Sequence, residues 1–173
     1  GKAGKWGYRT NLTAARLYYS QSGSRSEKYA LQPSALLTFE PNDNIHFRYR
    51  INLSKNAPAL SAMNDVEQAI NTWQIRRGNP NLKAFNTLSQ SLAAGKETVE
   101  ILLGYDHEYN PIMESVFYEA GRFIRIYENQ RSFQNLSAEA TFTVKPWKDH
   151  LTLSVTPRVN RYISKGNNYR HTY

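Results

Sequence analysis

The sequence predicts an all-β protein, an antiparallel up-and-down meander that is a fragment of a large transmembrane β-barrel. Three observations predict this fold: apolar and polar residues alternate, the predicted strands are long, and short turns alternate with long connections. Successive side chains of a strand point to opposite faces, so the alternation gives each strand one apolar and one polar face. A strand of about twelve residues covers roughly 40 Å, enough to cross a bilayer at a tilt.

The clearest strand covers residues 44–55. Its odd positions are apolar from Ile45 to Leu53, whereas its even positions include His46, Arg48 and Arg50. Weaker or shorter forms of the same alternation predict the other strands, about seven in all. They lie at residues 6–19, 29–39, 84–94, 99–105, 136–144 and 151–159.

The connections between these strands alternate in length. Tight turns are predicted near 40–44, 95–97 and 145–149, and long loops near 20–28, 56–83 and 110–133. Transmembrane barrels have short periplasmic turns and longer extracellular loops. Greek-key connections of a soluble sandwich mix both lengths at each end, so the alternation favours the barrel.

The charges assign the two faces of each strand. Turned toward lipid at the middle of a bilayer, Arg48 or Arg50 would each cost about 2–4 kcal/mol. The polar face with His46, Arg48 and Arg50 is therefore predicted to face the lumen. Aromatic residues gather near the predicted strand ends, as in the girdles of a membrane barrel: Trp6, Phe39 and Trp147 by the tight turns, and Tyr18, Tyr19, Tyr29, Tyr109 and Tyr162 by the long loops.

The alternation also fits a soluble antiparallel β-sheet module that binds glycan or protein through exposed Tyr and Trp, and this alternative stays open from the pattern. If lipid is the solvent, an unclosed sheet would leave two unpaired edges. The chain is then expected to be a segment of a larger barrel.

The composition excludes several classes of protein. The 173 residues have 22 Lys and Arg against 14 Asp and Glu, and 13% are aromatic, which is too rich in large side chains for a disordered chain. The sequence has no Cys, so disulfide frameworks and Cys-ligated metal sites are excluded. No apolar stretch approaches the roughly 18 residues of a spanning helix.

One motif carries a family resemblance. Gly78, Asn79, Pro80, Asn81 and Leu82 follow a long loop and lead toward a strand. This run resembles the C-terminal barrel region of TonB-dependent outer-membrane receptors of the Bacteroidetes type. Further along, the segments 110–112, 121–125 and 127–129 look like that family's next loop hairpin, and 145–147 looks like its next periplasmic turn.

The resemblance implies a receptor in the cell outer membrane of a Gram-negative bacterium that takes up a large nutrient such as a metal chelate, glycan or peptide. It implies four partners besides this nutrient: outer-membrane lipid, the receptor's own plug domain, the remaining barrel strands and an inner-membrane energy-coupling protein. The coupling protein would contact an N-terminal part that, like the plug domain, is expected to be absent from these 173 residues.

Candidate site residues lie in the long loop 56–83. Trp73, Arg76 and Arg77 combine an aromatic ring with guanidinium donors, a frequent ligand-contact combination, although packing of the loop explains them as well. The run Gly78 to Leu82 also has a structural interpretation, because Gly, Pro and Asn together favour a turn.

No catalytic, metal or cofactor site is predicted, and the protein is not expected to be an enzyme. His107 points away from its neighbours Asp106 and Glu108 if the segment is a strand. Nucleic-acid binding is not expected either, because Phe47 and Tyr49 point away from Arg48 and Arg50, so no basic stacking platform forms on that strand.

Overall fold

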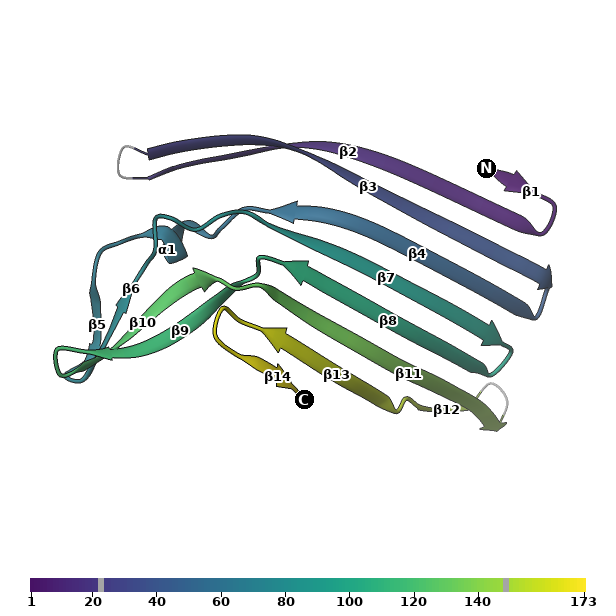
Figure 1. The fold of residues 1–173 in the computed structure, drawn as a ribbon. Helices are drawn as coiled ribbons and strands as arrows, with labels where there is room; N and C mark the ends of the chain where they lie inside the picture. The colour runs from purple at the N-terminus through teal and green to yellow at the C-terminus, as the bar shows by residue number, and fades with distance from the viewer. Residues whose placement is uncertain (22–23, 148–149) are drawn as a thin grey trace.

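The structure is a computed structural model that describes residues 1–21, 24–147 and 150–173, and it shows a long curved sheet with a smaller sheet at one end (Figure 1). The strands of the large sheet follow one another in the order β1-β2-β3-β4-β7-β8-β11-β13-β14, and β12 also pairs with β11. Within the described ranges these strands are β1 (Lys2–Ala3), β2 (Trp6–Gln21), β3 (Ser24–Asn42), β4 (Ile45–Asn56), β7 (Phe85–Lys96), β8 (Val99–Tyr109), β11 (Ser132–Trp147), β12 (Leu151–Val155), β13 (Arg158–Lys165) and β14 (Arg170–Thr172).

The strands of the large sheet are antiparallel, and their register joins the apolar faces into one surface. Tyr49 of β4 lies opposite Leu37 of β3 and Leu92 of β7, and Leu92 lies opposite Leu103 of β8. Residues opposite each other share a face, so the apolar surface continues from strand to strand. Large apolar side chains on it stay exposed, for example Leu31, with 66% of its surface accessible. The predicted antiparallel up-and-down architecture is confirmed.

Aromatic and charged residues bound this apolar surface along the strands. Near the tight turns, the ring of Phe39 stacks on Trp6 and Phe47, with centroids 4.3 and 6.1 Å apart. Toward the other end of β2 and β3, Arg16 and the hydroxyl of Tyr29 donate hydrogen bonds to Glu27, at 2.9 and 2.8 Å. From Phe39 to Tyr29 the strand covers about 33 Å, or about 25 Å of height at a tilt of about 40°, which matches the apolar band of an outer-membrane barrel.

Tight turns gather at one end of the large sheet (Figure 1). One of them joins β3 to β4 through Asp43 and Asn44, and the Asn44 amide donates to Oδ1 of Asn42 at 3.1 Å. Another joins β7 to β8, with Glu97 at a φ of 48°. The turn predicted near 145–149 is wrong in its first part, because β11 continues to Trp147; residues 148–149 lie outside the described ranges.

The loop predicted at 20–28 is largely wrong. Strand β2 continues to Gln21, β3 begins at Ser24, and these two residues lie opposite each other; residues 22–23 are outside the described ranges. The backbone hydrogen bonds between β2 and β3 do not depend on an alternation of apolar and polar side chains. A polar segment can therefore remain part of a strand.

The strand predicted at 151–159 is interrupted between β12 and β13 at Thr156 and Pro157. Proline has no N–H to donate to the ladder, so regular pairing ends there.

The long connections 56–83 and 110–133 contain regular structure and meet in the smaller sheet. The first contains α1 (Leu60–Met63), β5 (Gln68–Asn71) and β6 (Gln74–Arg77), and the second contains β9 (Ile112–Glu119) and β10 (Arg122–Asn129). The order of this outer sheet is β5-β6-β10-β9, and β6 and β10 pair in parallel. Near its base, Ile112 and Tyr127 pack on a buried cluster formed by Ala62, Met63 and Leu82. Among the described residues no helix has the length and apolar character needed to span a membrane.

Candidate functional site

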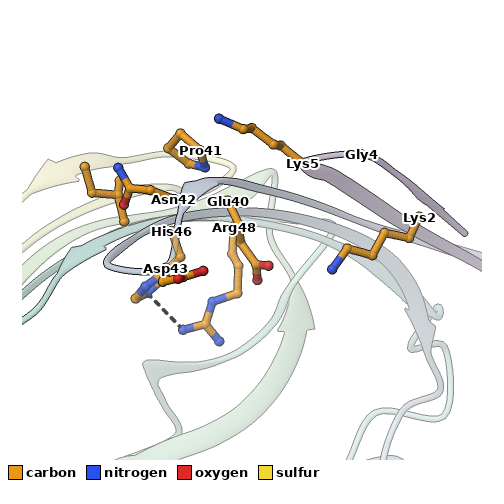
Figure 2. A pocket seen from close by; sticks show the side chains of 10 residues that line it. Lys2, Gly4, Lys5, Glu40, Pro41, Asn42, Asp43, His46 and Arg48 are labelled. Carbon is orange, nitrogen blue, oxygen red and sulfur yellow. Dashed lines mark hydrogen bonds between the residues drawn. The ribbon is translucent and has the colours of Figure 1, made fainter.

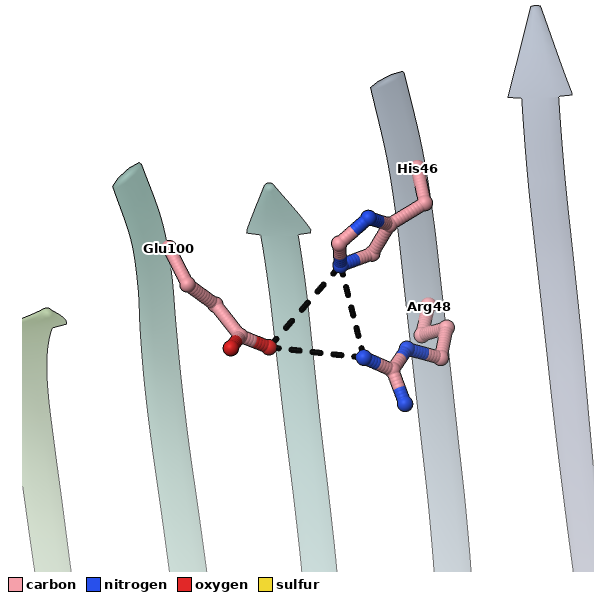
Figure 3. A network of polar contacts seen from close by, with 3 residues as sticks. All are labelled: His46, Arg48 and Glu100. Atoms are coloured by element: carbon pink, nitrogen blue, oxygen red, sulfur yellow. Dashed lines mark hydrogen bonds and ion pairs between the residues drawn. The ribbon is translucent and has the colours of Figure 1, made fainter. Parts of the chain in front are cut away.

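The polar face of β4 forms an ion network with β8. Nε2 of His46 lies 3.8 Å from Oε1 of Glu100, and the Arg48 guanidinium lies 3.4 Å from the same oxygen (Figure 3). A third contact, of 3.3 Å, joins Arg48 to Nε2 of His46. Sequence reasoning missed Glu100, although its place between Val99 and Ile101 already puts it on the polar face of β8.

Gly95 on the intervening strand β7 makes this network possible. His46 and Glu100 both lie opposite Gly95, one on each side of it. A Cβ atom at this glycine would be only 2.2 Å from Cε1 of His46. Because the position has no side chain, the imidazole and the carboxylate meet across β7.

The third predicted lumen residue, Arg50, shares the polar face but not the network. It lies opposite Leu36 of β3 and Ser91 of β7, and among the described residues it has no ion-pair partner. Farther across the same face, Nε of Arg158 donates a hydrogen bond to Glu139 at 2.7 Å. The polar face of the large sheet therefore carries both paired and unpaired charges.

A pocket of about 680 Å³ lies at the tight-turn end of the sheet and includes part of this network (Figure 2). His46, Arg48 and Lys2 project to one side of the ribbon in this view, whereas Lys5 projects to the other. Charged groups of both signs line the pocket, because Glu40 and Asp43 lie beside the basic residues. This lining suits polar protein groups better than an apolar ligand.

The three predicted loop residues are all in the outer sheet but do not form one cluster. Trp73 lies in the turn between β5 and β6, is 69% exposed, and accepts a hydrogen bond at its carbonyl from the Phe123 amide at 2.8 Å. Arg76 and Arg77 are consecutive in β6 and so point to opposite faces. Nε of Arg77 donates to Glu67 at 3.0 Å.

Arg76 has instead a neighbour that sequence reasoning missed. Arg125 of β10 lies in register with it, and the Arg125 guanidinium donates a hydrogen bond to Glu114 of β9. That bond raises the pKa of Arg125. Arg76 lies 4.0 Å from the same carboxylate. The β9–β10 hairpin is signalled by Gly121, at a φ of 82°, but nothing local in the sequence reveals its pairing with β6.

The Gly78 to Leu82 run anchors the base of the outer sheet. The Gly78 amide donates to the Asn64 carbonyl at 2.9 Å, and a Cβ atom at Gly78 would lie 2.0 Å from that oxygen. Asn79 donates from Nδ2 to the Tyr127 carbonyl at 3.0 Å and accepts at Oδ1 from the Asn81 amide at 3.0 Å. Pro80 and Asn81 are exposed, whereas Leu82 is buried in the cluster with α1.

Asn129 makes a second link between the two long connections. Its Nδ2 donates to the carbonyls of Lys83 and Asn110, each at 2.9 Å, and its Oδ1 accepts from the Lys83 amide at 2.8 Å. Together with the parallel β6–β10 pairing, these bonds make the outer sheet one connected platform rather than two separate loops.

Comparison with known proteins identifies similar sequences and folds. The sequence profile described as the outer membrane protein beta-barrel family matches residues 3–173. Among solved structures, the siderophore receptor PirA from Pseudomonas aeruginosa has a similar fold, with a TM-score of 0.63 and 14% sequence identity. The similarity covers 94% of this chain and 36% of that chain, so this chain spans little more than a third of that receptor's length. No curated protein matches the sequence.

Proposed function

The chain belongs to the outer membrane protein beta-barrel family and is located in the outer membrane, and we propose that it is part of the barrel of a TonB-dependent receptor. The receptor takes up a large nutrient such as a metal chelate, glycan or peptide. The Gly78 to Leu82 run and the fold shared with a siderophore receptor support this proposal. Membership in an outer-membrane family favours it over a soluble binding module, and a transport role over an enzymatic one.

The observation that carries the proposal is the division of the large sheet into two unlike faces. One face presents exposed Leu31, Leu37 and Leu92, and the other presents the network of His46, Arg48 and Glu100. Burying the charged face in lipid would cost about 2–4 kcal/mol for an Arg at mid-membrane, so the apolar face must be the one in contact with lipid. The charged face then lines the lumen.

The lumen face and the sheet edge supply surfaces for the rest of the receptor. We expect the plug domain to contact the ion network and the pocket beside Lys2. Among the described residues, the segment from Gly1 to Ala3 covers β2 only from Trp6 to Tyr8, so the rest of that edge is available to another barrel strand. We expect the energy for uptake to come from an inner-membrane coupling protein.

The outer sheet provides the proposed surface for capture of the nutrient. Trp73 is exposed at its tip, and Arg76 and Arg77 follow in β6. Hydrogen bonds of Asn79 and Asn129 connect the strands at its base. A connected platform loses little conformational entropy on binding, which favours affinity.

Growth on limiting nutrients tests the transport function. Cells with and without the receptor are compared on a panel of metal chelates, glycans and peptides, and each comparison is repeated in cells that lack the coupling protein. We expect one nutrient class to support growth only when both proteins are present. Growth that depends on the receptor but not on the coupling protein would reject a TonB-dependent mechanism.

The capture role is tested in the same cells with Trp73→Ala, Arg76→Ala and Arg77→Ala combined. We expect high-affinity uptake to be lost while the receptor remains at its normal level in the outer membrane. Unchanged uptake would show that these loop residues do not contact the nutrient.

A further inference from the structure

One face of the outer sheet carries two guanidinium groups side by side. Arg76 of β6 and Arg125 of β10 are opposite each other in the parallel register. Like charges directly opposite on a sheet are destabilising. Among the described residues, Glu114 is the only carboxylate within ion-pair distance of Arg76 or Arg125, and it is within that distance of both. The pair therefore keeps one positive charge without a counterion.

Both guanidinium groups also retain unused hydrogen-bond donors. The contact of Arg76 with Glu114 is 4.0 Å long, beyond hydrogen-bond range, and the Arg76 side chain forms no hydrogen bond within the described part of the chain. In Arg125, Nε is buried and has no hydrogen-bond partner. A buried donor without a partner is costly, and the exposed guanidinium of Arg76 beside it is the group that an incoming acceptor can reach.

Exposed aromatic rings lie beside the two arginines on the same face. Phe123 is two residues from Arg125 in β10, and Tyr118 of β9 lies opposite Phe123. The two rings meet edge to face with centroids 5.3 Å apart, and they are 50% and 66% exposed. Val116, which lies opposite Arg125, is exposed as well and completes an apolar strip next to the cations.

We propose that this face binds a ligand that joins an anionic group to a flat apolar ring. Arg76 and Arg125 receive the anion, and Tyr118 and Phe123 contact the ring. Glu114 positions Arg125 and at the same time competes with the ligand for both guanidinium groups. Arg77 takes no part, because it lies on the opposite face with Glu67. This inference rests on the proposed function, since it names the ligand class of the receptor's outer sheet.

A fluorescent aromatic acid tests the proposal on the receptor that carries this segment, purified in mild detergent. The probe is 2-naphthoate, and the matched neutral probe is 2-naphthamide. We expect Arg76→Gln to weaken naphthoate binding about tenfold, the effect of losing one charge-assisted contact, and to leave naphthamide binding unchanged. Arg122→Gln is the control, because Arg122 is on the same strand as Arg125 but on the opposite face, across from Glu119.

A second variant separates recognition of the anion from simple loss of structure. Glu114→Gln removes the competing carboxylate, so naphthoate should bind more tightly, whereas a cluster that is only structural would bind no better. Amide hydrogen exchange across β6 and β10 checks that the sheet is intact in each variant. Equal binding of the two probes, binding of neither, or an equal effect of Arg76→Gln and Arg122→Gln would overturn the proposal. The growth assay is independent of this result, so transport can hold even if this ligand class is wrong.

Discussion

His46 of β4 and Glu100 of β8 lie 3.8 Å apart although strand β7 runs between their strands. The contact exists because both residues lie opposite Gly95, where no side chain separates them. The missing side chain on β7 thus allows a charged pair to form on the polar face of the sheet between two strands that are not neighbours.

Restoring a side chain at that position should break the contact. We expect Gly95→Val to destabilise the barrel by about 1–3 kcal/mol, because a Cβ there would be 2.2 Å from the His46 ring. Urea unfolding in lipid vesicles, followed by tryptophan fluorescence, measures the change. In a His46→Ala background, Gly95→Val should reduce the free energy of unfolding much less. An equal reduction in both backgrounds would mean that the clash with the His46 ring is not the reason for glycine at position 95.

The two faces of the large sheet should differ in how well they tolerate a new charged side chain. Leu92→Arg puts a guanidinium on the apolar face and should cost about 2–4 kcal/mol if it lies near the bilayer midplane. Ser89→Arg is the matched control, since Ser89 lies on the polar face of the same strand, opposite Asn52 of β4 and Asp106 of β8. Folding yield into vesicles and urea midpoints compare the two. Equal tolerance of both substitutions would contradict the assignment of the apolar face to lipid.

Gly78 is expected to be the least replaceable residue of the outer sheet. Gly78→Ala places a Cβ 2.0 Å from the Asn64 carbonyl oxygen, and backbone cannot move aside as a flexible side chain can. We expect a loss of about 1–3 kcal/mol, at the upper end of that range. Limited proteolysis of the segments 56–84 and 110–131 should accelerate. Asn81→Ala, at an exposed position in the same run, should leave the proteolysis rate nearly unchanged.

Asn129 should control how firmly the two long connections are joined. Asn129→Ala removes side-chain bonds to Lys83 and Asn110, and we expect it to destabilise the outer sheet by about 1–2 kcal/mol. Amide exchange at Lys83, whose N–H donates to Asn129, reports the loss directly. Asn167→Ala, which removes a longer bond of 3.4 Å to the Asn129 carbonyl, should have a smaller effect. Equal exchange in the two variants would argue against a central role for Asn129.

The large sheet could be predicted because its pattern is local. From Ile45 to Leu53 the alternation by itself assigns each side chain to a face, and the structure has one strand there. The error at 20–28 has the opposite cause. Those residues lack a clear apolar face, but backbone pairing between Gln21 and Ser24 keeps them in strands.

The candidate sites could be predicted only in part. The sequence places Trp73, Arg76 and Arg77 within a few residues of one another, yet strand geometry sends the two arginines to opposite faces. Arg125 is 49 residues beyond Arg76 in the sequence, and only the β6–β10 pairing brings the two together. No local signal marks that pairing, because either segment could form a strand without the other.

By itself, the sequence determined the all-β class, the two unlike faces of the long strands and the position of most tight turns, because period-two alternation and turn residues act over a few neighbouring positions. The tertiary structure alone decided which distant charges meet. Glu100 reaches His46 through the register of three strands, and Arg125 reaches Arg76 through a parallel pairing between two long connections. Such contacts depend on which segments pair and in what register, and that choice is made by the packing of the whole chain.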